Sequence, residues 1–318
     1  MTVIESIQVK QESPPKGRML LIGDLIIDRT WHVDVHKISP EAPVPVASLN
    51  HKSPIETPGA GGLGATFATK YFPDMETIFL TATTRERAGW LHSKGIKNVI
   101  PHFTTENIIK TRYIDKESRY HLLRVDNDEV IDPPEMCNEH GENFLKKIRE
   151  ITEKKIDVIC MLDYRKGLFN DINITQQVIE IAKELNIPSF VDSRATNLDK
   201  FNGIDYLKLN KREFFDAQKT FNSSSYFDLL KKVGARNLLK TLAEEGAKLY
   251  NIETQQITAY KDYTKYAGAV DVTGCGDAFD ISFCYYCFIE GKTPQDALRL
   301  AVNKATYYAH QSIEERLC

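Results

Sequence analysis

The chain has 318 residues, of which 42% are hydrophobic and 27% are charged, so it can bury a large core without disulfides or structural metals. Its 41 basic and 44 acidic residues leave a formal charge of -3, which excludes a broad electrostatic attraction to nucleic acid or anionic lipid. There is no signal peptide or membrane-length apolar run, and the six cysteines lack zinc spacing. We therefore expect reduced thiols and a cytoplasmic protein without nucleic-acid or membrane partners.

Short apolar runs alternate with helical patterns, which predicts an α/β fold whose Rossmann-like, mostly parallel sheet is covered by helices. The first expected strand covers 18–24 and follows a flexible, polar lead-in over 1–17. Apolar residues recur at helical spacing over 174–186, so this segment can return the chain to a parallel strand. The other expected core strands cover 157–162, 188–192, 205–209 and 237–243.

Two segments interrupt this alternation. Residues 44–62 and 107–126 are rich in β-formers or in proline, and the second predicts a hairpin around 115–118. We expect them to pair as a small sheet outside the main one, forming a lid from about 29–60 and 103–126 on one domain over 18–318.

A helix is predicted near the carboxyl end of the chain. Thr293 is followed by Pro294 and, three positions on, by Asp296, which is the pattern of a capped helix start. The inward-facing residues of this helix are expected to be Ala297, Ala301, Ala305 and Tyr308.

The segment DVTGCGDAFD, residues 271–280, places two glycines before a long apolar helix that Gly291 is expected to end. Such a turn directs backbone N–H groups at one point, where the helix dipole also favours negative charge. Asp277 in this turn can accept the proton of a bound hydroxyl while the N–H groups stabilise a transferred phosphoryl group. The alternative is a simple strand-to-helix turn with Asp277 as an N-terminal cap; Asp280 is expected to be a first-turn acid.

A second glycine pattern, GxGxxG, is formed by Gly59, Gly61 and Gly64. Pro58 and the polar residues before it predict no strand leading into the pattern, which disfavours a dinucleotide-binding turn. Glycines that let a sugar approach the backbone explain it better. No GxxxxGK[ST] motif occurs in the chain, which excludes a P-loop kinase at the level of motifs.

The DVTGCGD segment resembles the D-T-x-G-A-G-D signature of the ribokinase, or PfkB, family of sugar kinases, with Cys275 in place of the usual alanine. LNKREF at 209–214 is similar to the family's N-x-x-E element, and TLAEEGAKLY at 241–250 is similar to its T-L-G-x-x-G stretch. These elements follow the family's order. The resemblance implies a ribokinase-like fold and phosphate transfer from ATP with Mg²⁺, and it also allows a monovalent cation.

The same resemblance implies a role for each matching residue. Asp277 is the expected base, and the backbone donors are expected to come from Gly274, Cys275 and Gly276. Asn210 and Glu213 are expected to hold Mg²⁺ through water molecules. The residues expected on the nucleotide side are Asn210, Thr241, Gly246, Asp271, Thr273 and Asn303.

One branch of the family fits best. The stretch GDLIIDRTWHVDVHKISPEAPVPV at 23–46 closely resembles the opening of bacterial heptose 7-phosphate kinases of ADP-heptose biosynthesis, and segments 110–126 and 163–169 are similar to the same branch. This implies transfer to the anomeric hydroxyl of a heptose 7-phosphate.

The branch also implies a substrate-binding set. Asp28 would bind sugar hydroxyls, while Lys110, Arg112 and Lys166 would meet the phosphate already on the sugar. For these three cations the alternative is a solvated hairpin and loop. The set is completed by Gly59, Ala60 and Asp163.

The chain departs from this branch at Leu63, which replaces an asparagine that would hydrogen-bond sugar hydroxyls, and at residues 193–195. A lost hydroxyl contact can change specificity by orders of magnitude. Two alternatives therefore stay open: a kinase of this family for another sugar, sugar phosphate or nucleoside, and a catalytically silent relative that binds sugar or nucleotide. Asp277 speaks against the silent form, because a binder needs no base.

The resemblance also bears on partners. Lid sheets of this family often associate, which implies a homodimer. Some relatives carry a fused cytidylyltransferase-like domain, whereas the sequence ends at Cys318 without one, so we expect a stand-alone kinase whose product passes to separate enzymes.

Overall fold

The computed structural model describes residues 14–49, 53–104, 106–127, 139–194, 197–264, 272–311 and 315–316. Within these ranges a nine-stranded sheet has the order β14-β13-β12-β11-β10-β9-β1-β5-β6, in which the pairs β12–β13 and β13–β14 are antiparallel and the other pairs are parallel. Its strands are β1 (Gly17–Gly23), β5 (Met75–Thr83), β6 (Asn98–Phe103), β9 (Val158–Asp163), β10 (Ser189–Ser193), β11 (Tyr206–Asn210), β12 (Asn237–Thr241), β13 (Ala247–Asn251) and β14 (Ile257–Tyr260).

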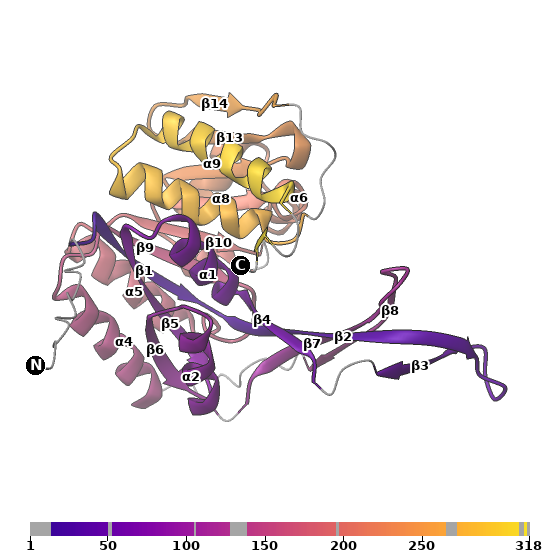
Figure 1. Cartoon of the computed structure of the whole chain (residues 1–318). Helices are drawn as coiled ribbons and strands as arrows, with labels where there is room; N and C mark the ends of the chain where they lie inside the picture. The colour runs from indigo at the N-terminus through magenta and orange to yellow at the C-terminus, as the bar shows by residue number, and fades with distance from the viewer. Residues whose placement is uncertain are drawn as a thin grey trace, which may run out of the picture.

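Helices cover both faces of this sheet (Figure 1). One face carries α4 (Glu139–Thr152), α5 (Ile172–Glu184), α6 (Lys211–Thr220) and α7 (Tyr226–Val233). The other carries α1 (Gly61–Tyr71), α2 (Arg85–Ser93), α8 (Cys275–Cys284) and α9 (Pro294–Ala309). Side chains alternate along β1, so Leu20 and Ile22 join the first core while Met19 and Leu21 join the second.

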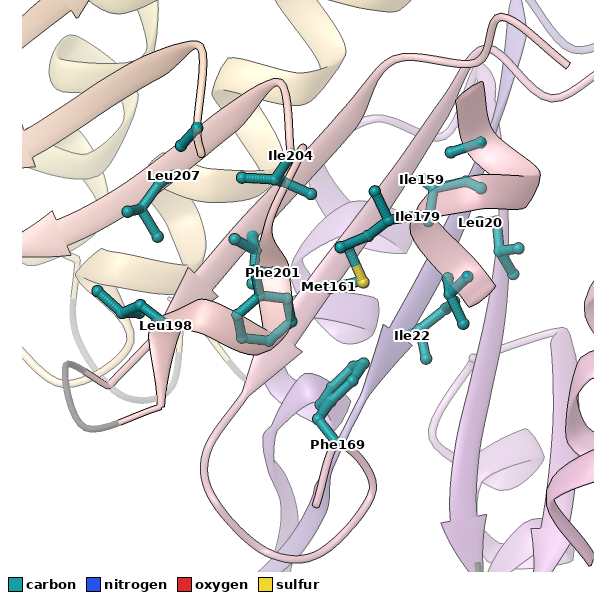
Figure 2. Packing of buried hydrophobic residues seen from close by; sticks show 14 of the residues in the cluster. Leu20, Ile22, Ile159, Met161, Phe169, Ile179, Leu198, Phe201, Ile204 and Leu207 are labelled. Carbon is teal, nitrogen blue, oxygen red and sulfur yellow. The ribbon is translucent and has the colours of Figure 1, made fainter. Parts of the chain in front are cut away.

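The first core is a continuous apolar layer between the sheet and its helices. Figure 2 shows Phe169, Ile179 and Phe201 packed near Met161 and Ile22 of the strands. All five of these side chains are almost fully buried. The predicted α/β class and the core strands are confirmed, with boundaries that differ by one or two residues. The predicted helix over 174–186 is also confirmed, as α5.

A smaller, five-stranded sheet leaves the main body at the end of β1 (Figure 1). Its order is β3-β2-β7-β8, and β4 pairs with the other part of β2. Its strands are β2 (Leu25–Ile38), β3 (Pro45–Leu49), β4 (Ile55–Ala60), β7 (Ile108–Asp115) and β8 (His121–Asn127). The expected small sheet and hairpin are therefore confirmed. Residues 1–13 of the expected lead-in, and residues 50–52 and 105 of the expected lid, lie outside the described residues.

One sequence prediction about the GxGxxG pattern was wrong. A strand, β4, does lead into it, and Pro58 pairs with Ile27 of β2. Proline is tolerated there because the pairing described for β4 is with β2 alone, which makes β4 an edge strand. The strand is antiparallel and belongs to the small sheet, so the pattern still does not open a parallel dinucleotide-binding unit.

Two glycines of this pattern are required by packing, and their role in sugar access stays a prediction. A Cβ atom on Gly61 would lie 2.9 Å from the carbonyl oxygen of Asp24, and one on Gly64 would lie 2.9 Å from Leu162 Cδ1. The first turn of α1 can therefore lie directly on the ends of β1 and β9. Gly59 differs, because a Cβ atom there would collide with the carboxylate of Asp28.

The predicted helix near the carboxyl end is confirmed as α9. Thr293 is its N-cap, accepting a hydrogen bond from the Asp296 N–H, and Pro294 is its first residue. Ala297, Ala301 and Tyr308 are buried. In the described part of the chain, no helix combines the length and apolar character that a membrane span requires.

Candidate active site

The predicted site residues gather at the carboxyl ends of the parallel strands. Asp163, Asn210 and Thr241 are the last residues of β9, β11 and β12, and Asp24 directly follows β1. The first turn of α8 lies at the same edge, beside Leu63 of α1. In open α/β sheets this edge is where ligands bind.

The glycine-rich turn has the conformation that an anion-binding turn needs. Gly274 is the N-cap of α8 with φ 80° and makes no side-chain cap, so the helix begins without a capping carboxylate or hydroxyl. Its first-turn N–H groups lack intrahelical partners, as at any helix start. A Cβ atom on Gly274 would lie 2.6 Å from Leu63 Cδ2, so only glycine fits there. Of the other residues assigned to this turn, Thr273 is exposed and Asp271 lies outside the described residues.

Asp277 is buried in the first turn of α8, and the hydroxyl of Tyr164 donates a hydrogen bond to its Oδ1 at 2.6 Å. Burial raises the pKa of Asp277 to about 7, against the lowering effect of the Tyr164 hydrogen bond. A carboxylate with a pKa near neutrality is suited to accept a proton. The alternative of Asp277 as the N-cap is wrong, because Gly274 holds that position.

The prediction for Asp280 was also wrong. Asp280 lies beyond the first turn of α8, is fully buried, and faces Lys208 of β11 with 3.7 Å between its Oδ2 and the lysine Nζ. The helix begins three residues too early for Asp280 to lie in its first turn. Among the described residues, neither of its carboxylate oxygens has a hydrogen-bond partner by distance and angle.

Asp24 holds the loop that carries Tyr164. Its buried carboxylate accepts backbone N–H bonds from Tyr164 at 2.9 Å, Lys166 at 3.1 Å and Leu168 at 3.2 Å. Burial and the charge of Asp163 raise the pKa of Asp24 to about 7. Sequence reasoning missed both Asp24 and Tyr164 as functional residues. The available signal was the position of Asp24, an acid directly after a buried strand.

Asp163 is engaged by the chain itself. Its Oδ2 lies 2.7 Å from the Nζ of Lys200 and accepts a hydrogen bond from Ser193 Oγ, also at 2.7 Å. Its Oδ1 accepts the Arg165 N–H. The side chain therefore fixes the same loop, and its direct contact with a sugar stays a prediction, as does that of the partly buried Lys166.

The residues expected on the sugar side come together on the small sheet. Asp28 and Lys110 are paired across β2 and β7, and Arg112 Nη1 lies 2.5 Å from Asp28 Oδ1. Gly59 faces the same carboxylate, and Ala60 has φ 53°, in the left-handed region that costs a non-glycine residue energy. The structure thus places one acid and two cations on a single face, next to a strained joint.

Asn210 and Glu213 form a capping box at the start of α6. Asn210 Oδ1 accepts the N–H groups of Arg212 and Glu213 at 2.9 Å, and Glu213 Oε2 accepts the Asn210 N–H at 2.7 Å. Burial and Asp192 raise the pKa of Glu213. Within the described residues no group of three or more acidic, histidine or cysteine ligands could hold a metal directly. The expected water-mediated Mg²⁺ contact of Asn210 and Glu213 stays a prediction.

The nucleotide-side residues lie beyond β11. Thr241 ends β12, and Gly246 has φ 83° where the chain turns into β13. A Cβ atom on Gly246 would collide with the backbone of Tyr260, so glycine is required for two reasons. On α9, the side-chain oxygen of Asn303 is buried and has no hydrogen-bond partner within the part of the chain that the structure describes. An unsatisfied buried acceptor of this kind fits a donor from a ligand.

The match to a family model, described as pfkB family carbohydrate kinase, covers residues 170–312. It includes Asn210, Asp277 and Asn303. The matched part, which is less than half of the chain, is similar to pfkB family carbohydrate kinases. The glycine-rich turn that carries Asp277 lies within it.

Curated relatives extend the match to nearly the whole chain. The bifunctional protein HldE of Actinobacillus succinogenes is 28% identical over 295 residues, which cover 90% of this chain and 59% of that protein. HldE of Campylobacter jejuni is 28% identical over 289 residues, covering 88% and 58%. The chain thus spans little more than half the length of these relatives.

Solved structures agree with the fold. Phosphofructokinase-2 from Escherichia coli, in a tetrameric inhibited form, matches with a TM-score of 0.70 and 14% identity, covering 95% of this chain and 96% of that one. Ribokinase from Giardia lamblia matches with a TM-score of 0.68 and 17% identity, covering 93% and 94%. The expected ribokinase-like fold is confirmed.

Proposed function

We propose that this chain, in the cytoplasm, transfers the γ-phosphoryl group of Mg·ATP to the anomeric hydroxyl of a heptose 7-phosphate. The observation that carries the phosphoryl-transfer part is Asp277, a buried carboxylate with a pKa of about 7 in the glycine-rich first turn of α8. The heptose part is supported by the similarity of 23–46 to heptose 7-phosphate kinases, since this stretch forms β2 and carries Asp28 beside Arg112.

The reaction follows from these positions. The acceptor hydroxyl attacks the γ-phosphorus, its proton passes to a carboxylate oxygen of Asp277, and the bond from phosphorus to the bridging oxygen breaks with its electron pair leaving on ADP. Backbone N–H groups at the start of α8 stabilise charge on the transferred group. Tyr164 orients Asp277 through its 2.6 Å hydrogen bond.

Charge neutralisation on the phosphate oxygens is the chemistry that Mg²⁺ supplies when bound. Asn210 Oδ1 and Glu213 Oε2 already accept backbone N–H groups, so these two residues would hold the hydrated ion through their remaining polar atoms. Lys110 and Arg112 would meet the phosphate on the acceptor, because a guanidinium binds phosphate oxygens in pairs.

A second candidate is a kinase of the same family for another sugar or sugar phosphate, and Leu63 is the observation that favours it. Leu63 packs against Gly274, so an apolar side chain lies directly beside the catalytic turn. A leucine at this place cannot hydrogen-bond a sugar hydroxyl. An acceptor with fewer hydroxyl groups facing the Leu63 side chain would fit this site better.

ADP release measured over a panel of sugars, sugar phosphates and nucleosides, with heptose 7-phosphate included, tests the proposal. A kcat/KM for heptose 7-phosphate that exceeds the others supports it, and a different preferred acceptor supports the second candidate. If no acceptor is phosphorylated while ATP binds tightly in calorimetry, the chain is a silent relative and the proposal fails.

We also propose that the small sheet forms a homodimer. The strand registers place Trp31, Leu49, Tyr113, Leu123 and Val125 on one face, opposite to the face of Asp28 and Arg112. Leu49, Leu123 and Val125 are 50–57% exposed, which leaves an apolar sheet face without cover in the monomer.

Analytical ultracentrifugation tests this second proposal. Leu123→Arg should shift a dimer to monomer, whereas Ile257→Arg on β14, where the side chain is 53% exposed, should not. A wild-type monomer at micromolar concentration contradicts the dimer.

A further inference from the structure

A lysine lies buried beneath the catalytic turn. Lys208, the third residue of β11, is 4% exposed, and its neighbours Leu207 and Leu209 belong to the core on the other face of the sheet. Its Nζ is 2.8 Å from Asp192 Oδ2 on the paired strand β10. A Cβ atom on Gly276 would lie only 3.3 Å from this Nζ. The ammonium group therefore lies on the side of Gly276 where a side chain would project, next to the glycine-rich turn.

The local balance of charge makes this lysine unusual. Burial raises the pKa of Asp280 well above its usual value, while the charge of Lys208 lowers it and the charges of Asp192 and Asp277 raise it further. Asp192 and the nearby Asp280 raise the pKa of Lys208, which stays charged. A buried ion pair contributes little net stability compared with apolar residues of the same volume. Packing alone thus gives no reason for a cation here.

We propose that Lys208 is a positioning residue for phosphoryl transfer: its ammonium, fixed behind Gly276, favours the ionised carboxylate of Asp277 and stabilises the negative charge that develops at the turn. This inference rests on the proposed function, because it requires Asp277 to be the base. Lys208 takes part in no covalent step.

The surroundings of Asp277 support an electrostatic role. Among the groups that affect its pKa, Lys208 lowers it and Asp192 raises it. An opposite charge within about 4–6 Å lowers a carboxyl pKa by roughly 1–3 units. In the described part of the chain, the titratable and charged groups that interact with Asp277 include Tyr164, Asp192, Lys208, Asp280 and Tyr308.

Lys208→Gln tests the charge while keeping a hydrogen-bond donor for Asp192. The acid-side midpoint of the kcat/KM profile should move up by about one pH unit, and kcat at pH 7 should fall roughly tenfold. The dissociation constant of ATP, measured by calorimetry, should change less than about threefold. Lys208→Arg, which keeps the charge, should return the midpoint close to the wild-type value.

The matched control is Lys240→Gln on the adjacent strand β12. Lys240 packs over the ring of Phe214, on the other face of the sheet, so its neutralisation should leave the midpoint unchanged. A folded Lys208→Gln protein whose pH midpoint equals that of the wild type overturns the proposal, even if its kcat is reduced. A lower kcat without a shift of the midpoint indicates a structural role.

Asp192→Asn provides an independent test of opposite sign. Removing this carboxylate removes an effect that raises the pKa of Asp277, so the midpoint should move to lower pH. If Lys208→Gln does not fold, Asp192→Asn becomes the test of the proposal. An acid-side midpoint that does not move in Asp192→Asn then overturns the proposal. Asp277→Asn distinguishes failure of the proposed function from failure of the role of Lys208. Normal turnover in Asp277→Asn refutes the proposed function. An inactive Asp277→Asn together with a normal Lys208→Gln refutes only the role of Lys208.

Discussion

Charged groups at the catalytic turn are buried, whereas those of the small sheet are partly exposed. Lys208 and Asp277 are each 4% exposed, while the side chains of the Asp28–Arg112 pair are 26% and 24% exposed. Electrostatic interactions are strong in the first environment and screened by water and salt in the second. The large sheet can therefore set proton affinity, and the small sheet can bind and release an acceptor.

The largest effect is expected at the base. Asp277→Asn should lower kcat by about two decades or more, because the positioned proton acceptor is lost while the fold and ATP binding remain. Steady-state kinetics with the best acceptor measure the loss, and calorimetry with ATP is the control. Near-normal turnover would show that the buried turn does not hold the chemistry.

A smaller effect is expected at the hydrogen-bond partner of the base. Tyr164→Phe should raise the pKa of Asp277 above its value of about 7, since the Tyr164 hydrogen bond lowers it. Because the ionised form is active, the acid-side midpoint of kcat/KM should move to higher pH and turnover at pH 7 should fall about tenfold. A midpoint that stays in place would argue that Tyr164 serves packing only.

In the small sheet, Arg112→Gln should act on binding. The KM for a phosphorylated acceptor should rise roughly five- to tenfold with little change in kcat, because a partly exposed, charge-assisted contact is lost. The same variant with the unphosphorylated sugar is the control, and its KM should hardly change. Equal effects on both acceptors would contradict a phosphate contact.

The smallest effect concerns stability. Leu123→Ala should lower the free energy of unfolding by less than about 0.5 kcal/mol at low protein concentration, because Leu123 is 56% exposed. Phe201→Ala, in the core of the large sheet (Figure 2), should cost about 3–5 kcal/mol. Urea denaturation measures both, and similar costs would show that the small sheet is as tightly packed as the core.

Much of the large sheet could be predicted from the sequence because its signals are local. Buried parallel strands appear as short apolar runs, such as 157–162, and α5 repeats apolar residues at helical spacing. The strand β4 was missed because local sequence patterns disfavour a strand that contains a proline such as Pro58. The proline is tolerated because β4 is an edge strand, and that position follows from the tertiary fold.

The candidate site could be predicted in part. The glycines and Asp277 stand together in one segment, so their motif reveals them. Tyr164 and Lys208 reach the same turn from other strands, and no local pattern distinguishes a buried lysine from a surface one. The burial of Asp280 was missed for the same reason, since its partner lies on β11.

A single residue, Asp24, separates β1 of the large sheet from β2 of the small one. Its backbone N–H bonds to the Leu162 carbonyl and its carbonyl accepts the Gly61 N–H, while its carboxylate holds the Tyr164 loop. One aspartate thus fixes both the step of the chain from the large sheet to the small one and the loop whose tyrosine bonds to Asp277.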